Sequence, residues 1–143
     1  MVEYILSPSQ AGDEMQRQMD LIRELLLKLE TIPMRPGGTI VIPPGDKNIA
    51  VPGYDSDQID YHFRQILKSG YIDDGGINSM TGLGFRCLTP AGHDFLDSVR
   101  DPETWAKTKK AAAGAGGFTI ELLRDLAKGF IKKQIEEKTG IKL

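Results

Sequence analysis

Hydrophobic residues recur three and four positions apart along two stretches of the chain, and this is the spacing of a helix that buries one face. The first stretch runs from Asp13 to about Thr31. The second begins at a capping Asp55 or Ser56 and ends at Gly70. The apolar positions are Met15, Met19, Leu21, Ile22, Leu25, Leu26 and Leu29 in the first stretch and Ile59, Phe63, Ile66 and Leu67 in the second. We expect both stretches to form core helices.

Two dipeptides mark further helix starts. Thr89-Pro90 and Asp101-Pro102 each place a side-chain oxygen that can cap a free backbone N–H directly before a proline, which lacks that group. We therefore expect two abutting helices, the second of them anchored by Trp105, the only tryptophan. The buried face of the first helix carries Phe95, Leu96 and Val99.

A last helix is predicted after a glycine-rich joint at residues 113–117. It runs from about Thr119 to Lys138, and Gly140 stands where a left-handed C-cap belongs. The side chains expected to face inward are Ile120, Leu123, Leu126, Ala127, Phe130 and Ile131.

Proline and glycine are frequent in residues 33–53, which excludes a long helix there. Two β-like runs in this region, residues 39–42 and 47–51, predict an irregular hairpin. Residues 71–73 and 84–88 predict two further strands around a glycine-rich loop. A helix, a pair of strands and another helix follow in the order of a winged-helix domain, in which the strand pair forms the wing.

The motifs resemble known domains in this region. Residues 61–72, the predicted hairpin and the run Leu88-Thr89-Pro90-Ala91-Gly92 resemble the second half of winged-helix (winged helix-turn-helix) domains. Together with Gly92-His93-Asp94-Phe95-Leu96-Asp97, Met19-Asp20-Leu21-Ile22-Arg23, Arg100-Asp101 and Trp105, the chain is similar to a family of short bacterial and prophage proteins classed as a domain of unknown function. The resemblance extends over about residues 15–135 and implies a winged-helix core without an assigned activity.

We therefore expect an α+β architecture in three parts. Residues 1–12 form an N-terminal arm, residues 13–100 form the winged-helix-like domain with its β-hairpin insertion, and residues 101–143 form a C-terminal helical extension. The Pro/Gly-rich stretch leaves no room for the scaffold helix that precedes the recognition helix in ordinary winged helices.

Composition and charge limit the kinds of site that the chain can hold and the compartment in which we expect it. The chain has 143 residues and one cysteine, Cys87, so it has no internal disulfide framework and no four-cysteine zinc site. No apolar run approaches the length of a membrane span and no signal core is visible, so we expect a cytoplasmic protein. The net charge is −2, yet residues 1–100 hold 9 Lys/Arg and 14 Asp/Glu whereas residues 101–143 hold 9 and 6.

The predicted helix after Asp55 offers one candidate binding face. Its exposed side chains, with one from the wing, are Tyr61, Arg64, Gln65, Lys68 and Arg86, and they suit either a partner protein or nucleic acid. A winged helix reads DNA with the start of this helix, where Asp55, Asp57 and Asp60 stand instead of cations. Those carboxylates serve the helix dipole, and they count against DNA binding.

The second candidate surface is the basic tail formed by Lys128, Lys132 and Lys133 on the last helix. This amphipathic helix can dock on its own domain, pair with a second copy or lie on an anionic membrane. Acidic residues dilute its cationic face, so docking or self-association is expected and membrane binding is not.

The residues with potential chemistry are expected to be structural. His93 and Asp97 have the spacing of a helical contact and predict a His-Asp hydrogen bond that holds the joint to the extension, together with Thr89, Gly92 and Trp105. His62 is expected to be a partly buried packing residue, and Cys87 a small buried hydrophobe. No catalytic residue, cofactor or metal site is predicted.

The sequence thus favours a non-catalytic binding module. We expect a prophage- or defence-associated accessory or adaptor protein that acts through protein–protein contact and self-association. The alternative is a winged-helix DNA-binding transcriptional regulator.

Overall fold

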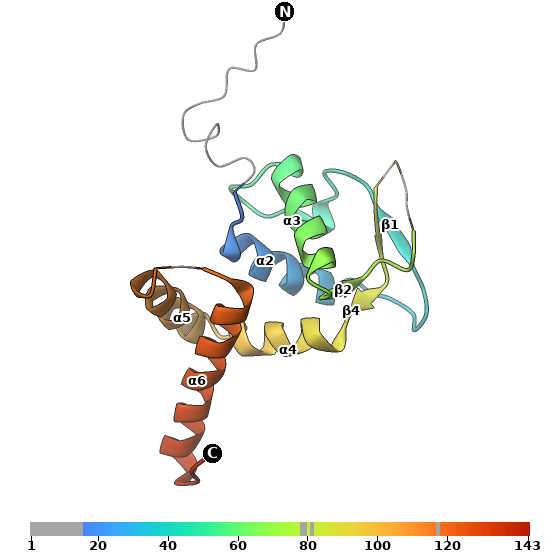
Figure 1. Ribbon diagram of the computed structural model, residues 1–143. Coiled ribbons are helices and arrows are strands. Elements are labelled where there is room, and N and C mark those ends of the chain that lie inside the picture. Colours follow the sequence, from blue (N-terminus) through green and yellow to red (C-terminus); the bar gives the residue numbers. More distant parts are fainter. Residues whose placement is uncertain (1–15, 78–79, 81, 117) are drawn as a thin grey trace, which may run out of the picture.

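A computed structural model describes residues 16–77, 80, 82–116 and 118–143, so the predicted N-terminal arm lies outside the described residues. The fold is α+β, with helices around two small pairs of antiparallel strands (Figure 1). The elements are α2 (Met19–Glu30), β1 (Ile40–Ile42), a 3-10 turn η1 (Lys47–Ile49), α3 (Ser56–Lys68), β2 (Ile72–Asp73), β3 (Leu83–Phe85), β4 (Cys87–Leu88), α4 (Pro90–Val99), α5 (Pro102–Gly114) and α6 (Ile120–Thr139).

Helix α2 forms the centre of the core. It packs against α3, α4, β4 and η1, which explains why its apolar stripe is so broad. Its fully buried side chains are Leu21, Ile22, Leu25 and Leu26. The helix begins at Met19, because Gln18 has an extended backbone and acts as N-cap. The predicted start at Asp13 lies outside the described residues, and residues 16–18 are not helical.

The predicted starts of α3, α4, α5 and α6 are confirmed, and each is held by a side-chain cap. Thr89, Asp101 and Thr119 each accept a hydrogen bond from the N–H three residues ahead, at 3.0, 2.8 and 3.0 Å. Asp55 and Gln58 form a reciprocal capping box at the start of α3. Local chemistry therefore determines where these helices begin.

The predicted hairpin between residues 39–42 and 47–51 is wrong. Strand β1 pairs instead with β3, with Ile40 opposite Phe85 and Ile42 opposite Leu83. Residues 47–49 form η1, because the Asp46 carboxylate accepts the Asn48 N–H at 2.7 Å and starts a tight turn. This turn buries a single residue, Ile49, in the core.

The return strand of the wing is divided at Arg86. Its first part is β3, which pairs with β1, and its second part is β4, which pairs with β2 and places Ile72 opposite Leu88. The Arg86 N–H bonds to the Asp73 carbonyl of β2 at 2.8 Å, so Arg86 links the two strand pairs. The order α3, β2, the divided strand β3 and β4, then α4 agrees with the helix, two strands and helix predicted for a winged-helix domain.

Helix α6 is only half covered by the other residues that the structure describes. Its first half packs on α4 and α5, with Leu123 and Ala127 fully buried, whereas its second half projects from the body (Figure 1). Ile131 is half-buried and Ile135 is 40% exposed. None of the helices in the described part of the chain is long and apolar enough to cross a membrane.

Candidate binding surfaces

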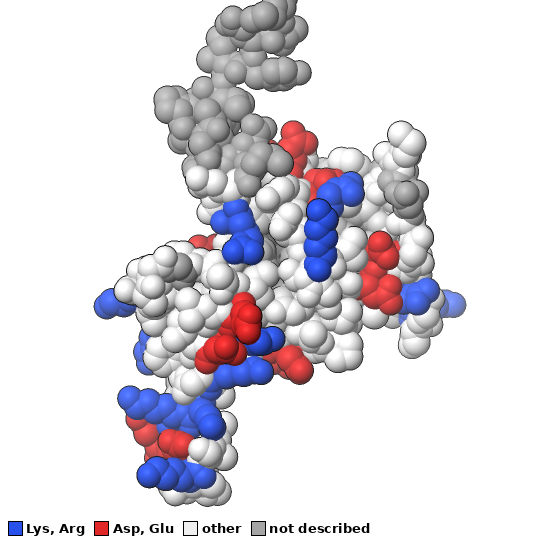
Figure 2. Space-filling model, in the orientation of Figure 1, with Lys and Arg blue, Asp and Glu red and all other residues white. Residues whose placement is uncertain are grey.

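The candidate face on α3 has little free positive charge. Arg64 and Lys68 are exposed, whereas Tyr61 and Gln65 are half-buried. Arg64 forms an ion pair with Asp60 on the same helix, with Nε 2.6 Å from Oδ1. On the side of the molecule shown in Figure 2, basic and acidic side chains are interspersed.

The wing adds no free cation to this face. Arg86 forms an ion pair with Asp73 at 3.8 Å, and its Nε donates to Thr39 Oγ1 at 3.4 Å. Lys68 is the one basic side chain of the predicted face without an ion pair in the part of the chain that the structure describes. The structure thus brings these residues near two carboxylates, which weakens attraction to phosphate.

His62 is a buried structural residue that joins the start of α2 to α3. Its ring is fully buried, accepts the Gln18 N–H at Nε2 (2.7 Å) and donates from Nδ1 to the Gln58 carbonyl (2.7 Å). These two bonds require the neutral ring with its proton on Nδ1. Burial lowers the pKa of His62 below its ordinary value of 6.5, although the bond to Gln58 opposes this shift.

We expect the buried His62 ring to make stability depend on pH. The unfolded chain binds this proton more tightly, so the contribution is complete above pH 6.5 and is lost as pH falls toward the lower folded pKa. The free energy of unfolding should decrease between pH 7.5 and 5.5 by at most about 1.4 kcal/mol per pH unit. Urea titrations check this: His62→Gln should remove the slope and His93→Gln, on an exposed ring, should keep it.

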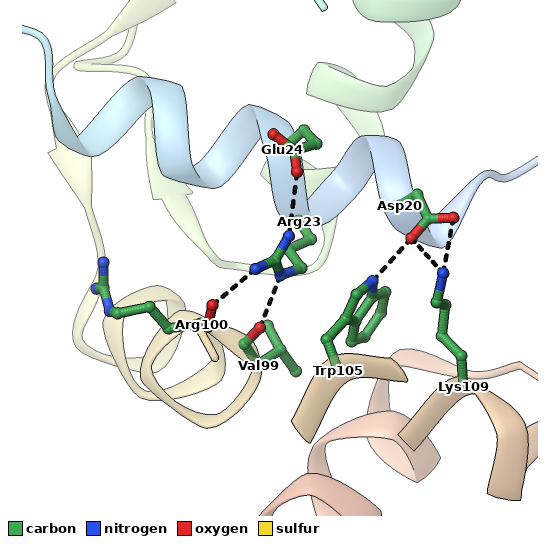
Figure 3. A network of polar contacts seen from close by, with 7 residues as sticks. All are labelled: Asp20, Arg23, Glu24, Val99, Arg100, Trp105 and Lys109. Atoms are coloured by element: carbon green, nitrogen blue, oxygen red, sulfur yellow. Dashed lines mark hydrogen bonds and ion pairs between the residues drawn. The ribbon is translucent and has the colours of Figure 1, made fainter. Parts of the chain in front are cut away.

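The C-terminal extension is joined to α2 by a buried arginine (Figure 3). Arg23 is 8% exposed; its Nε donates to the Val99 carbonyl at 2.7 Å and its Nη2 to the Arg100 carbonyl at 2.6 Å. Its guanidinium carbon lies 6.0 Å from the centroid of the Trp105 ring. Arg23 therefore satisfies carbonyl groups at the end of α4 that have no partner within the helix.

Asp20 makes the second connection of the extension to α2 (Figure 3). Its carboxylate accepts a hydrogen bond from Trp105 Nε1 at 2.7 Å and forms an ion pair with Lys109 Nζ at 2.9 Å. Burial alone would raise the pKa of Asp20, but the bonds from Lys109 and Trp105 outweigh it and lower the pKa below its usual range. Trp105 is thus a buried anchor with its polar edge satisfied.

The predicted hydrogen bond between His93 and Asp97 is wrong. Among the described residues, Asp97 pairs with Arg100 at 2.9 Å, and Arg100 also binds Glu30 at 3.0 Å. The Asp97 carboxylate is therefore bound to the Arg100 guanidinium and not to the His93 ring. The hydrogen bonds from Arg100 lower the pKa of Glu30. The joint to the extension is therefore formed by Arg23 and Asp20, not by His93.

Cys87 is exposed, so the prediction of a buried thiol is wrong. Side chains alternate along β4, and Leu88 takes the core side. Cys87 and His93 line one cavity of about 240 Å³ with Glu30, whose carboxylate is bound to Arg100. The described residues contain no group of three or more His, Cys, Asp or Glu side chains that could hold a metal ion.

The motif from Thr89 to Asp97 serves packing. The Thr89 hydroxyl donates to the Gly70 carbonyl at 2.6 Å, and the Thr89 N–H bonds to the Tyr71 carbonyl at 3.0 Å. A Cβ on Gly92 would lie 2.0 Å from that same carbonyl oxygen. The Phe95 ring stacks on Tyr71, with centroids 5.1 Å apart.

A groove between α4 and α6 contains part of the predicted basic tail. Its volume is about 390 Å³, and its lining residues are Asp97, Ser98, Lys128, Ile131, Lys132 and Ile135. Lys133 is exposed and does not line the groove. Ile135, one helical turn after Ile131 on the same stripe, is not among the surface residues predicted from the sequence.

Comparison with known proteins gives a family without a recorded activity. The profile of the family described as "Hypothetical protein (DUF2513)" matches residues 16–118. A protein of Haemophilus influenzae, described as an uncharacterized protein, is 30% identical over 125 residues, which are 85% of this chain and 99% of that protein. No solved structure matches the chain.

Proposed function

The chain belongs to the DUF2513 family of hypothetical proteins, and we propose that it is a non-catalytic binding module that contacts a partner protein through α6. The observation that carries this proposal is the projecting half of α6 (Figure 1). Ile135 is 40% exposed on this half, and Ile141 and Leu143, which follow the helix, are 61% and 57% exposed. Several large apolar side chains exposed within one short segment mark an interaction site, because solvating them is unfavourable.

The alternative function, DNA binding through α3, has weaker support. Asp57 stands in the first turn of α3, where a winged helix would meet phosphate, and Arg64 is occupied by Asp60. The proposed module therefore uses its winged-helix core as a scaffold that presents α6. The prophage or defence setting and self-association stay predictions.

We expect Ile135→Asp to abolish partner recovery. A carboxylate in place of a buried interface isoleucine should reduce binding about tenfold or more. Cross-linking in the producing cells followed by mass spectrometry would measure the recovery of each cross-linked protein. The matched control is Val41→Asp on β1, because Val41 is 41% exposed and lies on a different surface.

Two results would contradict the proposed function. In the first, the two variants recover the same proteins in the same amounts as the unmodified chain. In the second, the chain shifts duplex DNA at low salt, and Arg64→Ala or Lys68→Ala weakens that complex while Ile135→Asp does not.

A further inference from the structure

The groove between α4 and α6 has an apolar floor on α6. Ile131 and Ile135 line it one helical turn apart, and Ser98 lines it from α4. The Ser98 hydroxyl donates to the Asp94 carbonyl at 2.8 Å, so it offers no free hydrogen-bond donor to the groove. The floor therefore selects an occupant by apolar contact.

The α6 side of this groove is cationic. Lys128 and Lys132 line it one turn apart, both are exposed, and neither forms an ion pair with any residue that the structure describes. Asp97 lines the groove from α4 and is compensated by Arg100. Residues 126–143 hold five lysines and two glutamates, and basic side chains are prominent over the projecting helix in the lower part of Figure 2. An apolar floor beside two unpaired cations is complementary to an apolar stripe flanked by carboxylates.

A second copy of the chain is a poor occupant. An antiparallel pair of α6 helices that sets Ile131 against Ile135 of the copy sets Lys133 opposite Lys133 of the copy. The same register sets Lys128 opposite Lys138 of the copy. Like charges at such spacing are destabilising, so the exposed stripe is better matched by a different protein.

From this complementarity we propose that the groove receives an acidic amphipathic helix of a partner protein. Such a helix would place apolar side chains at i, i+3, i+4 and i+7 on Ile131 and Ile135 and carboxylates near Lys128 and Lys132. The inference rests on the proposed function and names the chemistry of its partner. A bilayer surface is a different occupant, because a broad, flat surface would contact α6 without entering the groove between α4 and α6.

The test uses a labelled peptide of about fourteen residues, roughly four helical turns, with leucines on one face and glutamates on the rest. A second peptide has every glutamate replaced by lysine. Fluorescence anisotropy with the full chain should show the acidic peptide binding at least tenfold more tightly than the basic one. Lys128→Glu with Lys132→Glu should reverse this preference.

Matched variants separate the groove from general charge attraction. Lys133→Glu with Lys138→Glu changes net charge equally, but neither residue lines the groove, so the acidic peptide should lose less than threefold in affinity. Asp97→Asn removes a carboxylate from the α4 side of the groove and should increase the affinity for the acidic peptide about twofold. Ile135→Ser should weaken it about tenfold.

Several outcomes would overturn the proposal. They are equal binding of both peptides, equal losses in the two double-lysine variants, and a dimer in sedimentation velocity that Ile135→Ser dissociates. Binding to phosphatidylserine vesicles that both double variants weaken equally, without peptide binding, would assign the face to a membrane. If neither peptide binds but Ile135→Asp still abolishes cross-linking to a protein, the proposed function stands and the acidic-helix partner is wrong.

Discussion

Replacing Gly92 with alanine is expected to destabilise the fold by about 3 kcal/mol. The added Cβ would lie 2.0 Å from the carbonyl oxygen of Tyr71 and 2.9 Å from its carbonyl carbon. Both are backbone atoms, so no side-chain rotation relieves the collision, and α4 must move away from the turn after α3. That movement would disturb the bond from the Thr89 N–H to Tyr71 and the stacking of Phe95 on the Tyr71 ring.

Gly129→Ala is the matched control for this substitution. Gly129 lies on an exposed part of α6, and a Cβ there meets no atom within 4 Å. Alanine should stabilise the helix by about 0.5–1 kcal/mol, because glycine loses more backbone freedom on folding. Urea unfolding followed by circular dichroism measures both variants, and equal midpoints for Gly92→Ala and Gly129→Ala would refute the packing role of Gly92.

Helix starts could be predicted from the sequence because capping is local. Thr89, Asp101 and Thr119 each act on an N–H three residues ahead, and this relation is visible in the chain. Strand pairing could not be predicted in the same way. The partner of β1 is β3, more than forty positions later, whereas the nearer run at residues 47–51 has the same β-like composition but turns into η1.

The candidate surface was only partly predictable. Lys128 and Lys132 stood out by charge, but nothing local shows that α6 leaves the body halfway along, which exposes Ile135. Arg23 was also missed, although a charged residue between Ile22 and a further run of leucines is a usable signal. A long cation on the apolar side of a core helix requires buried acceptors, and these come from the distant end of α4.

Arg23→Met is expected to lower the free energy of unfolding by about 3 kcal/mol, since two hydrogen bonds from a charged donor are lost in a buried site. Methionine keeps much of the aliphatic volume beside Trp105, so packing contributes little to the loss. The carbonyl groups of Val99 and Arg100 would remain where water has limited access, without the donors that now satisfy them. Urea unfolding at pH 7 measures the change.

Two comparison variants show whether the arginine fork itself is responsible. Arg23→Lys retains the charge, but a single ammonium cannot reproduce the separate Nε and Nη2 bonds, so it should recover only part of the lost stability. Arg64→Met removes an exposed arginine with one i,i+4 ion pair and should change stability by about 0.5 kcal/mol or less. If Arg23→Met unfolded at the same urea concentration as Arg64→Met, the end of α4 would be satisfied by other donors, and Arg23 would not join the extension to α2.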